Sequence, residues 1–148
     1  MAPPSGTPVF GAAPPGVVCR PRRAAYVVIR AANGLVAAIR VLDRDERCYW
    51  LPGGEMGSRE APEDAVCREV REELGRGIRL RGRIGDAVQY FPADETERWY
   101  EMTATFLRAE FDDERPGKGE HELVWLDVRR AGEMFYHSCH AWAAVRPV

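Results

Sequence analysis

The sequence predicts a single α/β domain, because one amphipathic helix lies among several strand-like runs in a chain of domain size. The 148 residues, 45% apolar and 30% charged, are enough to bury a core of their own. Strands are expected at 24–30, 35–42, 48–51, 78–90, 99–111 and 122–126, and a closing helix at 138–145. Nothing in the composition indicates a second domain or an internal repeat.

Glycine-rich turn signals separate or interrupt these strands. Asn33-Gly34 between the first two runs predicts a β-hairpin. Glycines inside the run 78–90 predict breaks in that strand. Trp50 and Leu51 end a short apolar run and lead into Pro52-Gly53-Gly54, which reads as a glycine turn where a ligand can approach the backbone closely.

The first 21 residues differ from the rest in composition. They hold six of the 11 prolines together with several alanines and glycines. We therefore expect residues 1–21 to form a flexible leader and residues 22–148 to form the domain. No apolar run is long enough for a signal peptide or a membrane span, so a cytoplasmic location without membrane contact is expected. The four cysteines are scattered singly and are expected to be free thiols.

The charge balance argues against general nucleic-acid binding. The net charge is −2, and the only basic stripe is Arg20, Arg22 and Arg23. A small anionic substrate would therefore need local arginines or a metal ion.

The segment between Pro62 and Gly75 predicts an amphipathic helix. At about 100° per residue, Val66, Val70 and Leu74 fall on one face. Pro62 suits a first helical position, where its missing N–H is not needed, and Gly75 suits the end of a helix.

Three glutamates, Glu69, Glu72 and Glu73, share a separate sector of this helix. Close carboxylates repel one another and raise one another's pKa values unless a cation lies between them. The oxygen-only set suits Mg²⁺, which could polarise a phosphorus and activate a water. The alternative is an ordinary solvated helix face, in which Arg68 and Glu72 form an (i, i+4) pair worth about 0.2–0.5 kcal/mol.

The full pattern resembles the box of the Nudix hydrolase family. The matching positions are Gly54, Glu60, Arg68, Glu69, Val70, Glu72, Glu73 and Gly75, all in register. The resemblance implies an α/β/α sandwich around a mixed β-sheet, a magnesium ion that manganese could replace, and cleavage of the diphosphate in a nucleoside diphosphate linked to another group. The substrates it implies are ADP-ribose, nucleotide sugars, (d)NTPs or dinucleoside polyphosphates.

The resemblance also assigns roles to residues of the box. It implies that Glu69, Glu72 and Glu73 bind the metal together with the main-chain carbonyl of Gly53. Glu72 and Glu73 are then also catalytic, and Arg68 orients the glutamates. Glu60 supports the loop and the helix.

Two residues depart from the family pattern. Arg59 stands where a glycine usually precedes the first box glutamate, so the loop is expected to follow a different path. Arg76 stands where the box normally ends on an apolar residue, so the sequence does not show how the end of the helix contacts the core.

Candidates outside the box come from three segments. Glu120 and Glu122 precede a strand, where many members of the family carry a further glutamate that binds metal or activates water. Phe91 and Trp99 are candidates for stacking on a base, and Arg40 for binding a phosphate. The alternatives are that Glu120 and Glu122 belong to an ordinary polar loop, that Phe91 and Trp99 pack in the core, and that Arg40 is an ordinary exposed arginine.

Two other functions stay open. Some members of the family act as nucleotide-sensing regulators and catalyse no reaction. Arg59 is compatible with a loop that is no longer shaped for catalysis. The same chemistry on the 5′ end of RNA would need an electropositive groove. The sequence does not decide whether the protein is a monomer or a homodimer.

Overall fold

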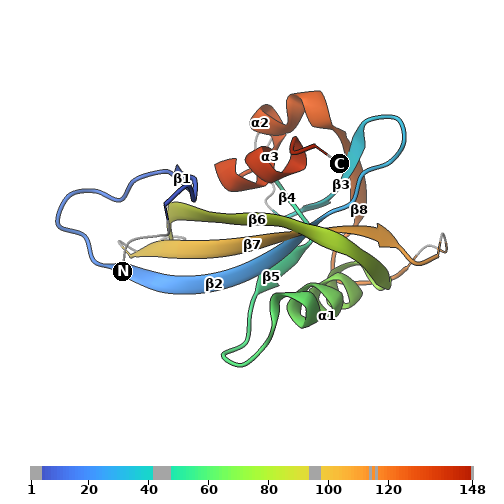
Figure 1. Cartoon of the computed structure of the whole chain (residues 1–148), viewed down its shortest axis with the longest axis horizontal. Coiled ribbons are helices and arrows are strands. Elements are labelled where there is room, and N and C mark those ends of the chain that lie inside the picture. The colour runs from blue at the N-terminus through green and yellow to red at the C-terminus, as the bar shows by residue number, and fades with distance from the viewer. Residues whose placement is uncertain (1–4, 42–47, 94–97, 114, 116, 148) are drawn as a thin grey trace.

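The computed structural model describes residues 5–41, 48–93, 98–113, 115 and 117–147. A long twisted sheet runs through the molecule, with helix α1 (Pro62–Leu74) on one side and helices α2 (Ala131–Met134) and α3 (Ser138–Ala144) on the other (Figure 1). The fold is therefore an α/β/α sandwich around a mixed sheet, which confirms the expected class.

The main sheet has five strands in the order β1-β6-β7-β2-β5. These are β1 (Val9–Phe10), β6 (Ile78–Pro92), β7 (Trp99–Phe111), β2 (Cys19–Val28) and β5 (Gly53–Glu55). Strands β6 and β7 are antiparallel, while β2 runs parallel to β7. The parallel pair places the amino-terminal ends of β2 and β7 at the same end of the sheet.

A second sheet of three strands has the order β4-β3-β8. Its strands are β4 (Tyr49–Trp50), β3 (Leu35–Arg40) and β8 (Leu123–Asp127), and β8 leads into the 3-10 helix Val128–Arg130. The chain passes from β4 in this sheet to β5 in the main sheet within a few residues. This crossing brings Trp50 close to the diglycine segment.

The two faces of the main sheet bury separate cores because residues alternate between them along each strand. On β2, Ala25 and Val27 pack with Val66 and Val70 of α1. Tyr26 on the same strand packs on the opposite face, in the cluster that includes Cys139 of α3. Helix α1 is thus held on one face by the apolar stripe that its sequence predicts.

The expected hairpin forms only at its turn. Gly34 has a φ of 82°, and its N–H donates to the carbonyl of Ala31 at 3.2 Å. Arg30 then bridges Val36, but β2 and β3 diverge into different sheets. The turn was predicted correctly, and the pairing of the two whole strands was not, because each strand finds its main partner elsewhere in the fold.

Strand β6 is continuous where the sequence predicted breaks. Its pairing with β7 shifts register between Leu80 and Gly82 and between Arg83 and Gly85, so the glycines lie at β-bulges. The expected glycine turn at 52–54 also differs, since Gly53–Glu55 forms β5 at the sheet edge.

Part of the expected leader lies within the sheet. Val9 and Phe10 pair with Val88 and Gln89 of β6, and the Phe10 ring lies 6.3 Å from the ring of Trp142. Strand β2 begins at Cys19, before the expected boundary. A two-residue strand carries too little hydrophobic pattern to be seen among prolines and glycines. In the part of the chain that the structure describes, no helix is long and apolar enough to cross a membrane.

Candidate active site

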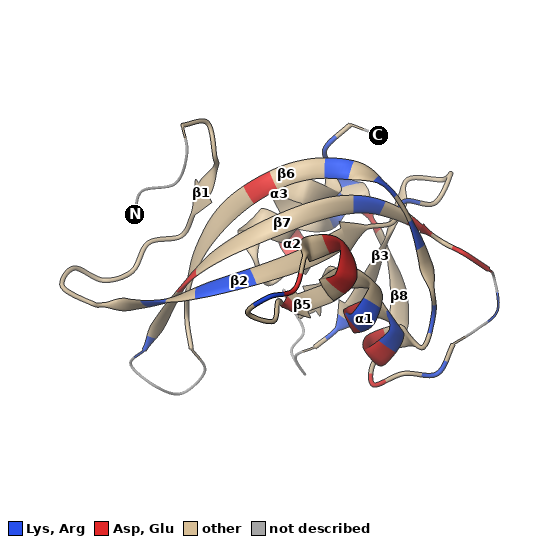
Figure 2. Cartoon of the chain, turned by 60° about the horizontal axis from the view of Figure 1, so that its bottom comes forward, with Lys and Arg blue, Asp and Glu red and all other residues tan. Residues whose placement is uncertain are grey.

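The acidic sector of α1 faces the diglycine segment of β5. Figure 2 shows acidic residues on α1 close to the edge where β5 lies. Helix α1 begins at Pro62 and ends at Leu74, and Gly75 caps it in a left-handed conformation with a φ of 64°. Both ends confirm the sequence prediction, and the orientation of the helix is set by its buried apolar stripe.

Glu73 is the most enclosed of the three glutamates. Its side chain is buried at 7% exposure, and its Oε1 accepts a hydrogen bond from the Gly53 N–H at 2.9 Å. Burial raises the pKa of Glu73 to about 8, the Gly53 hydrogen bond opposes this rise, and the charges of Glu69, Glu120 and Glu72 add to it. The carboxyl group therefore holds a proton at neutral pH unless a cation compensates for its charge.

Glu69 lies against the second glycine of the pair. A Cβ atom on Gly54 would come within 2.9–3.0 Å of the Glu69 carboxylate atoms, which is closer than real side chains pack. Burial also raises the pKa of Glu69, although Arg68 opposes the rise. Gly53 is required by the neighbouring strand, because a Cβ atom there would collide with the Ala25 carbonyl oxygen, whereas at Gly54 the contact is with the movable end of the Glu69 side chain.

Arg68 holds the remaining acidic groups together. Its Nε and Nη2 each donate to Glu60 at 2.8 Å, and Nη1 lies 3.0 Å from Glu69 and 3.4 Å from Glu72. Hydrogen bonds from Arg68 lower the pKa of Glu60 to about 2. Glu60 also accepts from the Gly57 N–H at 3.0 Å, so it fixes the loop before α1 as expected. Arg59 is exposed in this loop.

The chemistry of these donors fits a hard divalent cation, but their present geometry is not a finished site. Among the described residues, no group of three His, Cys, Asp or Glu is arranged to hold a metal. The Glu72 side chain is 48% exposed and lies 3.4 Å from Nη1 of Arg68. Gly53 joins the site through its N–H, whereas the resemblance implied its carbonyl as a ligand.

The loop 117–121 packs on the last turn of α1. The N–H groups of Glu120 and His121 donate to the carbonyls of Glu72 and Glu73 at 3.0 and 2.8 Å. The charge of Glu120 reaches Glu73, where it contributes to the raised pKa. Glu122 is exposed at the start of the next strand and has no such link. Of these two glutamates, only Glu120 is among the charges that raise the pKa of Glu73.

Gly119 is where this loop comes closest to α1, since a Cβ there would collide with the backbone of Glu73. We expect Gly119→Ala to lower the free energy of unfolding by about 1–3 kcal/mol, as overpacking does. Gly132→Ala is the matched control, because nothing lies within 4 Å of a Cβ at that position. Urea denaturation of the two variants measures the difference, and equal stability would mean that the loop does not press on the helix.

The three predicted substrate residues lie apart from one another. Phe91 and Tyr100 are register partners and share a face of the main sheet, with ring centroids 5.3 Å apart. Trp99 precedes Tyr100 on β7, so its side chain points to the opposite face. Arg40 belongs to the other sheet, where its guanidinium lies 5.9 Å above the Tyr49 ring. Of the three, Phe91 belongs to an aromatic group near the start of β2.

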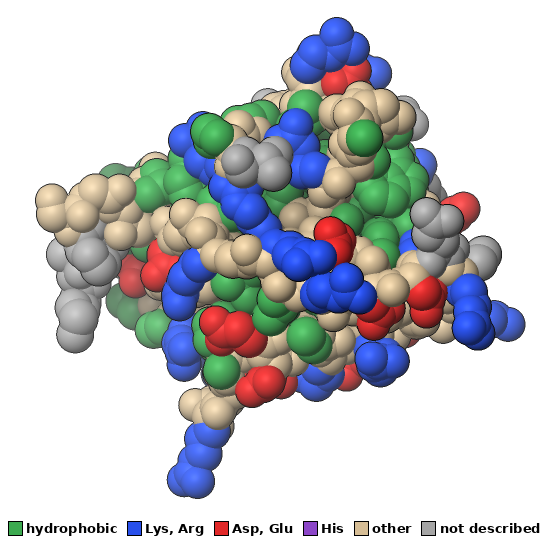
Figure 3. Space-filling model, turned by 45° about the vertical axis from the view of Figure 1, so that its right-hand side comes forward, with side chains coloured by type: hydrophobic (Ala, Val, Ile, Leu, Met, Phe, Trp, Pro, Cys, Tyr) green, Lys and Arg blue, Asp and Glu red, His purple; other side chains and the backbone are tan. Residues whose placement is uncertain are grey.

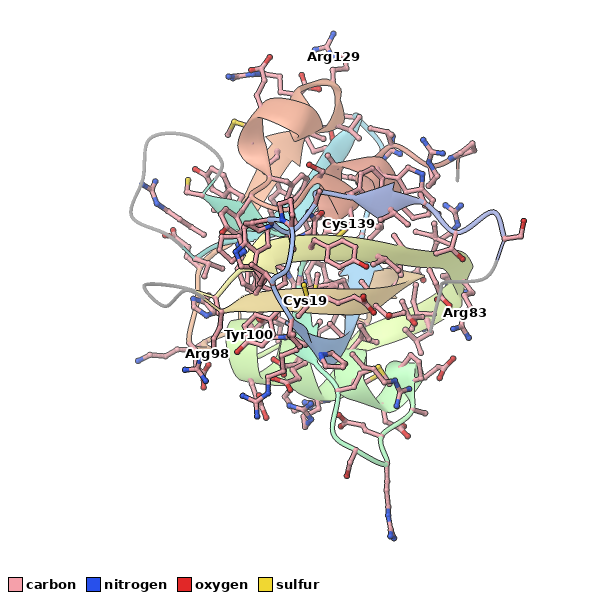
Figure 4. All side chains as sticks on the ribbon, turned by 90° about the vertical axis from the view of Figure 1, so that its left-hand side faces the viewer. Cys19, Arg83, Arg98, Tyr100, Arg129 and Cys139 are labelled. Atoms are coloured by element: carbon pink, nitrogen blue, oxygen red, sulfur yellow. The ribbon has the colours of Figure 1, made fainter. Side chains whose placement is uncertain are left out.

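This aromatic group continues onto the α3 side of the sheet. His137 lies 4.6 Å from the Phe91 ring and 4.9 Å from the Trp50 ring, both measured between centroids. In Figure 4, Tyr100 lies close to Cys19, at the end of the sheet where β2 and β7 begin. Because Trp50 precedes Gly53 by three positions, the aromatic group and the glutamates are joined by one short segment.

Sequence reasoning did not single out Arg22 or His137 as members of a site. Arg22 lies 3.8 Å from Glu55 and 5.5 Å above the Tyr100 ring, with its side chain 23% exposed. Burial lowers the pKa of His137 to about 4, so it is neutral at physiological pH. The only available signal was the alternation along β2, which puts Arg22 on the face of Ala24 and Tyr26.

Comparison with known proteins gives a family match and several structures with a similar fold. The family model of the NUDIX domain matches residues 20–142, which is most of the chain. The chain belongs to the Nudix family. A comparison with curated proteins finds no match.

Several solved structures of this family share the fold. A MutT NUDIX hydrolase from Burkholderia pseudomallei is 26% identical, with a TM-score of 0.60 over 87% of this chain and 99% of that chain. A MutT protein from Methanosarcina mazei is 21% identical, with a TM-score of 0.61 over 84% and 90%. The dihydroneopterin triphosphate pyrophosphohydrolase of E. coli is 20% identical, with a TM-score of 0.66 over 86% and 94%. At these identities the last two show a shared fold only.

Proposed function

We propose that this Nudix protein hydrolyses the diphosphate linkage of a small nucleotide with the help of a divalent cation, Mg²⁺ first and Mn²⁺ as a substitute. The observation that carries the proposal is the pair of carboxylates, Glu69 and Glu73, packed against Gly53 and Gly54. Burial raises the pKa of both carboxyl groups, so keeping them ionised inside the fold costs stability. Such a cost is typical of a site that works with a bound cation.

Each residue of the site has a separate task in this proposal. Glu69, Glu72 and Glu73 would hold the cation, which supplies positive charge for linked phosphoryl groups. Arg68 positions the glutamates, and Glu60 positions Arg68 through two hydrogen bonds. Glu120, which is exposed and whose charge acts on Glu73, would accept a proton from an attacking water.

The aromatic group supports a substrate with a planar ring. Phe91 and Tyr100 are half-buried on the sheet face and leave ring surface accessible. Stacking of a base on an aromatic side chain is worth about 1–3 kcal/mol. The charge of Arg22 beside Tyr100 suits an anionic group attached to such a ring.

Phe91→Ala tests this part of the proposal. We expect the KM for the best nucleotide to rise about 5- to 100-fold with a smaller change in kcat, because stacking binds the substrate without touching the reacting phosphorus. Trp99→Ala is the matched control, since its side chain lies on the opposite face of the sheet. Steady-state kinetics decide between the two faces, and a KM effect confined to Trp99→Ala would contradict the proposal.

The function itself is tested by turnover. The protein is incubated with Mg²⁺ and a panel of ADP-ribose, nucleotide sugars, (d)NTPs, dihydroneopterin triphosphate and dinucleoside polyphosphates, and the products are separated. We expect a nucleoside monophosphate, or its pterin counterpart, together with the phosphorylated remainder. Saturable binding without any turnover would instead identify a non-catalytic nucleotide sensor.

A further inference from the structure

A cavity of about 290 Å³ lies at the far end of α1, away from the proposed substrate site. It is bounded by the end of α1, the start of β6 and the segment that follows β7. Three arginines line it, Arg71, Arg76 and Arg115, together with two aspartates and two glycines. Figure 3 shows that basic and acidic side chains also alternate over the surface of the molecule, so the number of arginines alone is not informative.

What distinguishes these three arginines is their lack of acidic partners. Within the described residues, none of their guanidinium groups forms a salt bridge, whereas Arg79 and Arg81 on the neighbouring strand both pair with Glu110. The Arg76 guanidinium lies 3.8 Å above the Phe111 ring and donates to a main-chain carbonyl. Its Nε is buried without a hydrogen-bond partner among the described residues.

The two aspartates of the cavity are directed to the backbone. The Asp113 carboxylate accepts from the Arg115 N–H at 2.9 Å. The Asp112 carboxylate lies against Gly77, where a Cβ would collide with it. Neither aspartate therefore neutralises a guanidinium directly, and the lining carries three positive charges against two negative charges.

The negative end of the α1 dipole is also compensated. The N–H groups of Gly75, Glu120 and His121 donate to the carbonyls of Arg71, Glu72 and Glu73. These bonds leave fewer free carbonyls to repel an anion at this end of the helix. Around the helix axis, Arg71 lies about 140° from Val66, whereas the acidic sector lies about 240–340° from it. Arg71 therefore points to a different side of the helix from the glutamates.

We propose that this cavity binds a phosphate dianion. Guanidinium groups match phosphate through paired N–H donors, and within the described residues none of the three guanidinium groups that line the cavity is held by a salt bridge. Arg76 replaces the apolar residue that usually ends the family box, so the site is a feature of this chain. Free phosphate and a phosphomonoester carry the same dianion and are both candidate ligands.

Isothermal titration calorimetry of the full chain tests the proposal. The protein is titrated with inorganic phosphate and, separately, with AMP, in chelator and at constant ionic strength, so that the glutamates hold no metal. We expect one saturable site for at least one ligand, with affinity reduced at least tenfold in Arg76→Leu and Arg115→Leu. The ligand that binds more tightly identifies the source of the dianion.

Two controls make the result specific. Arg130→Leu removes an equal charge from the 3-10 helix outside the cavity and should bind like wild type. Glu73→Gln should also retain binding, which separates the cavity from the proposed active site. Arg115 is exposed, so its variant tests the proposal even if Arg76→Leu fails to fold. Absence of saturable heat for both ligands, or equal affinity in wild type and Arg115→Leu, would overturn it, whether or not the protein hydrolyses nucleotides.

Discussion

Replacing Glu72 or Glu73 by glutamine should reduce turnover by about two to four orders of magnitude while the domain remains folded. A carboxamide keeps the shape of the side chain and loses the charge that a divalent cation needs. For Glu73 the amide oxygen can still accept the Gly53 N–H, so the main structural contact survives. The measurement is the steady-state rate with Mg²⁺ on the best substrate of the panel, with circular dichroism as the check of folding.

Glu63→Gln is the matched control for this pair of variants. Glu63 lies in the first turn of the same helix and is exposed, so its variant changes helix charge without touching the proposed metal ligands. We expect its rate to stay near that of wild type. Wild-type turnover in purified Glu72→Gln or Glu73→Gln would refute the assignment of the acidic sector.

Although Glu73→Gln should reduce turnover, it should increase the stability of the metal-free protein. This gain in stability should depend on pH. Burial raises the folded-state pKa of Glu73 to about 8, above its ordinary value of 4.5. The unfolded chain therefore loses this proton at lower pH, and the wild type loses stability as pH rises from about 4.5 to about 8. Above that range the penalty is complete.

The expected gain from the substitution is near zero at pH 4 and on the order of a few kcal/mol at pH 9, since one pKa unit corresponds to about 1.4 kcal/mol. Chemical denaturation in chelator at the two pH values measures it. Adding Mg²⁺ at pH 9 should stabilise wild type more than Glu73→Gln, because the variant lacks one of the three proposed carboxylate ligands. An equal gain at both pH values would show that the buried charge is not the cause.

Much of the fold could be predicted because its strongest signals are local. Helix α1 has a proline at one end, a glycine at the other and an apolar stripe between them, and the structure confirms all three. Strand β7 was predicted with its observed bounds, Trp99–Phe111. Strand β1 and helix α2 were missed, because elements of two and four residues show no periodicity. The division into two sheets depends on long-range pairing, which a hairpin signal does not report.

The site was predictable to the extent that one helix carries it. The spacing of Glu69, Glu72 and Glu73 places them on one side of any α-helix. The aromatic group could not be predicted in this way, since Trp50, Phe91 and His137 come from three distant segments and meet only in the folded chain. The raised pKa of Glu73 likewise depends on burial, which the sequence does not specify.

The position of the Arg68 guanidinium has a consequence for biosynthesis. The four acidic side chains of the candidate site, Glu60, Glu69, Glu72 and Glu73, lie on or beside α1, and without compensation their mutual repulsion would oppose helix formation. The guanidinium contacts three of them, Glu60, Glu69 and Glu72. A newly made chain can therefore form this helix before it binds any ion, because its own arginine offsets part of the repulsion.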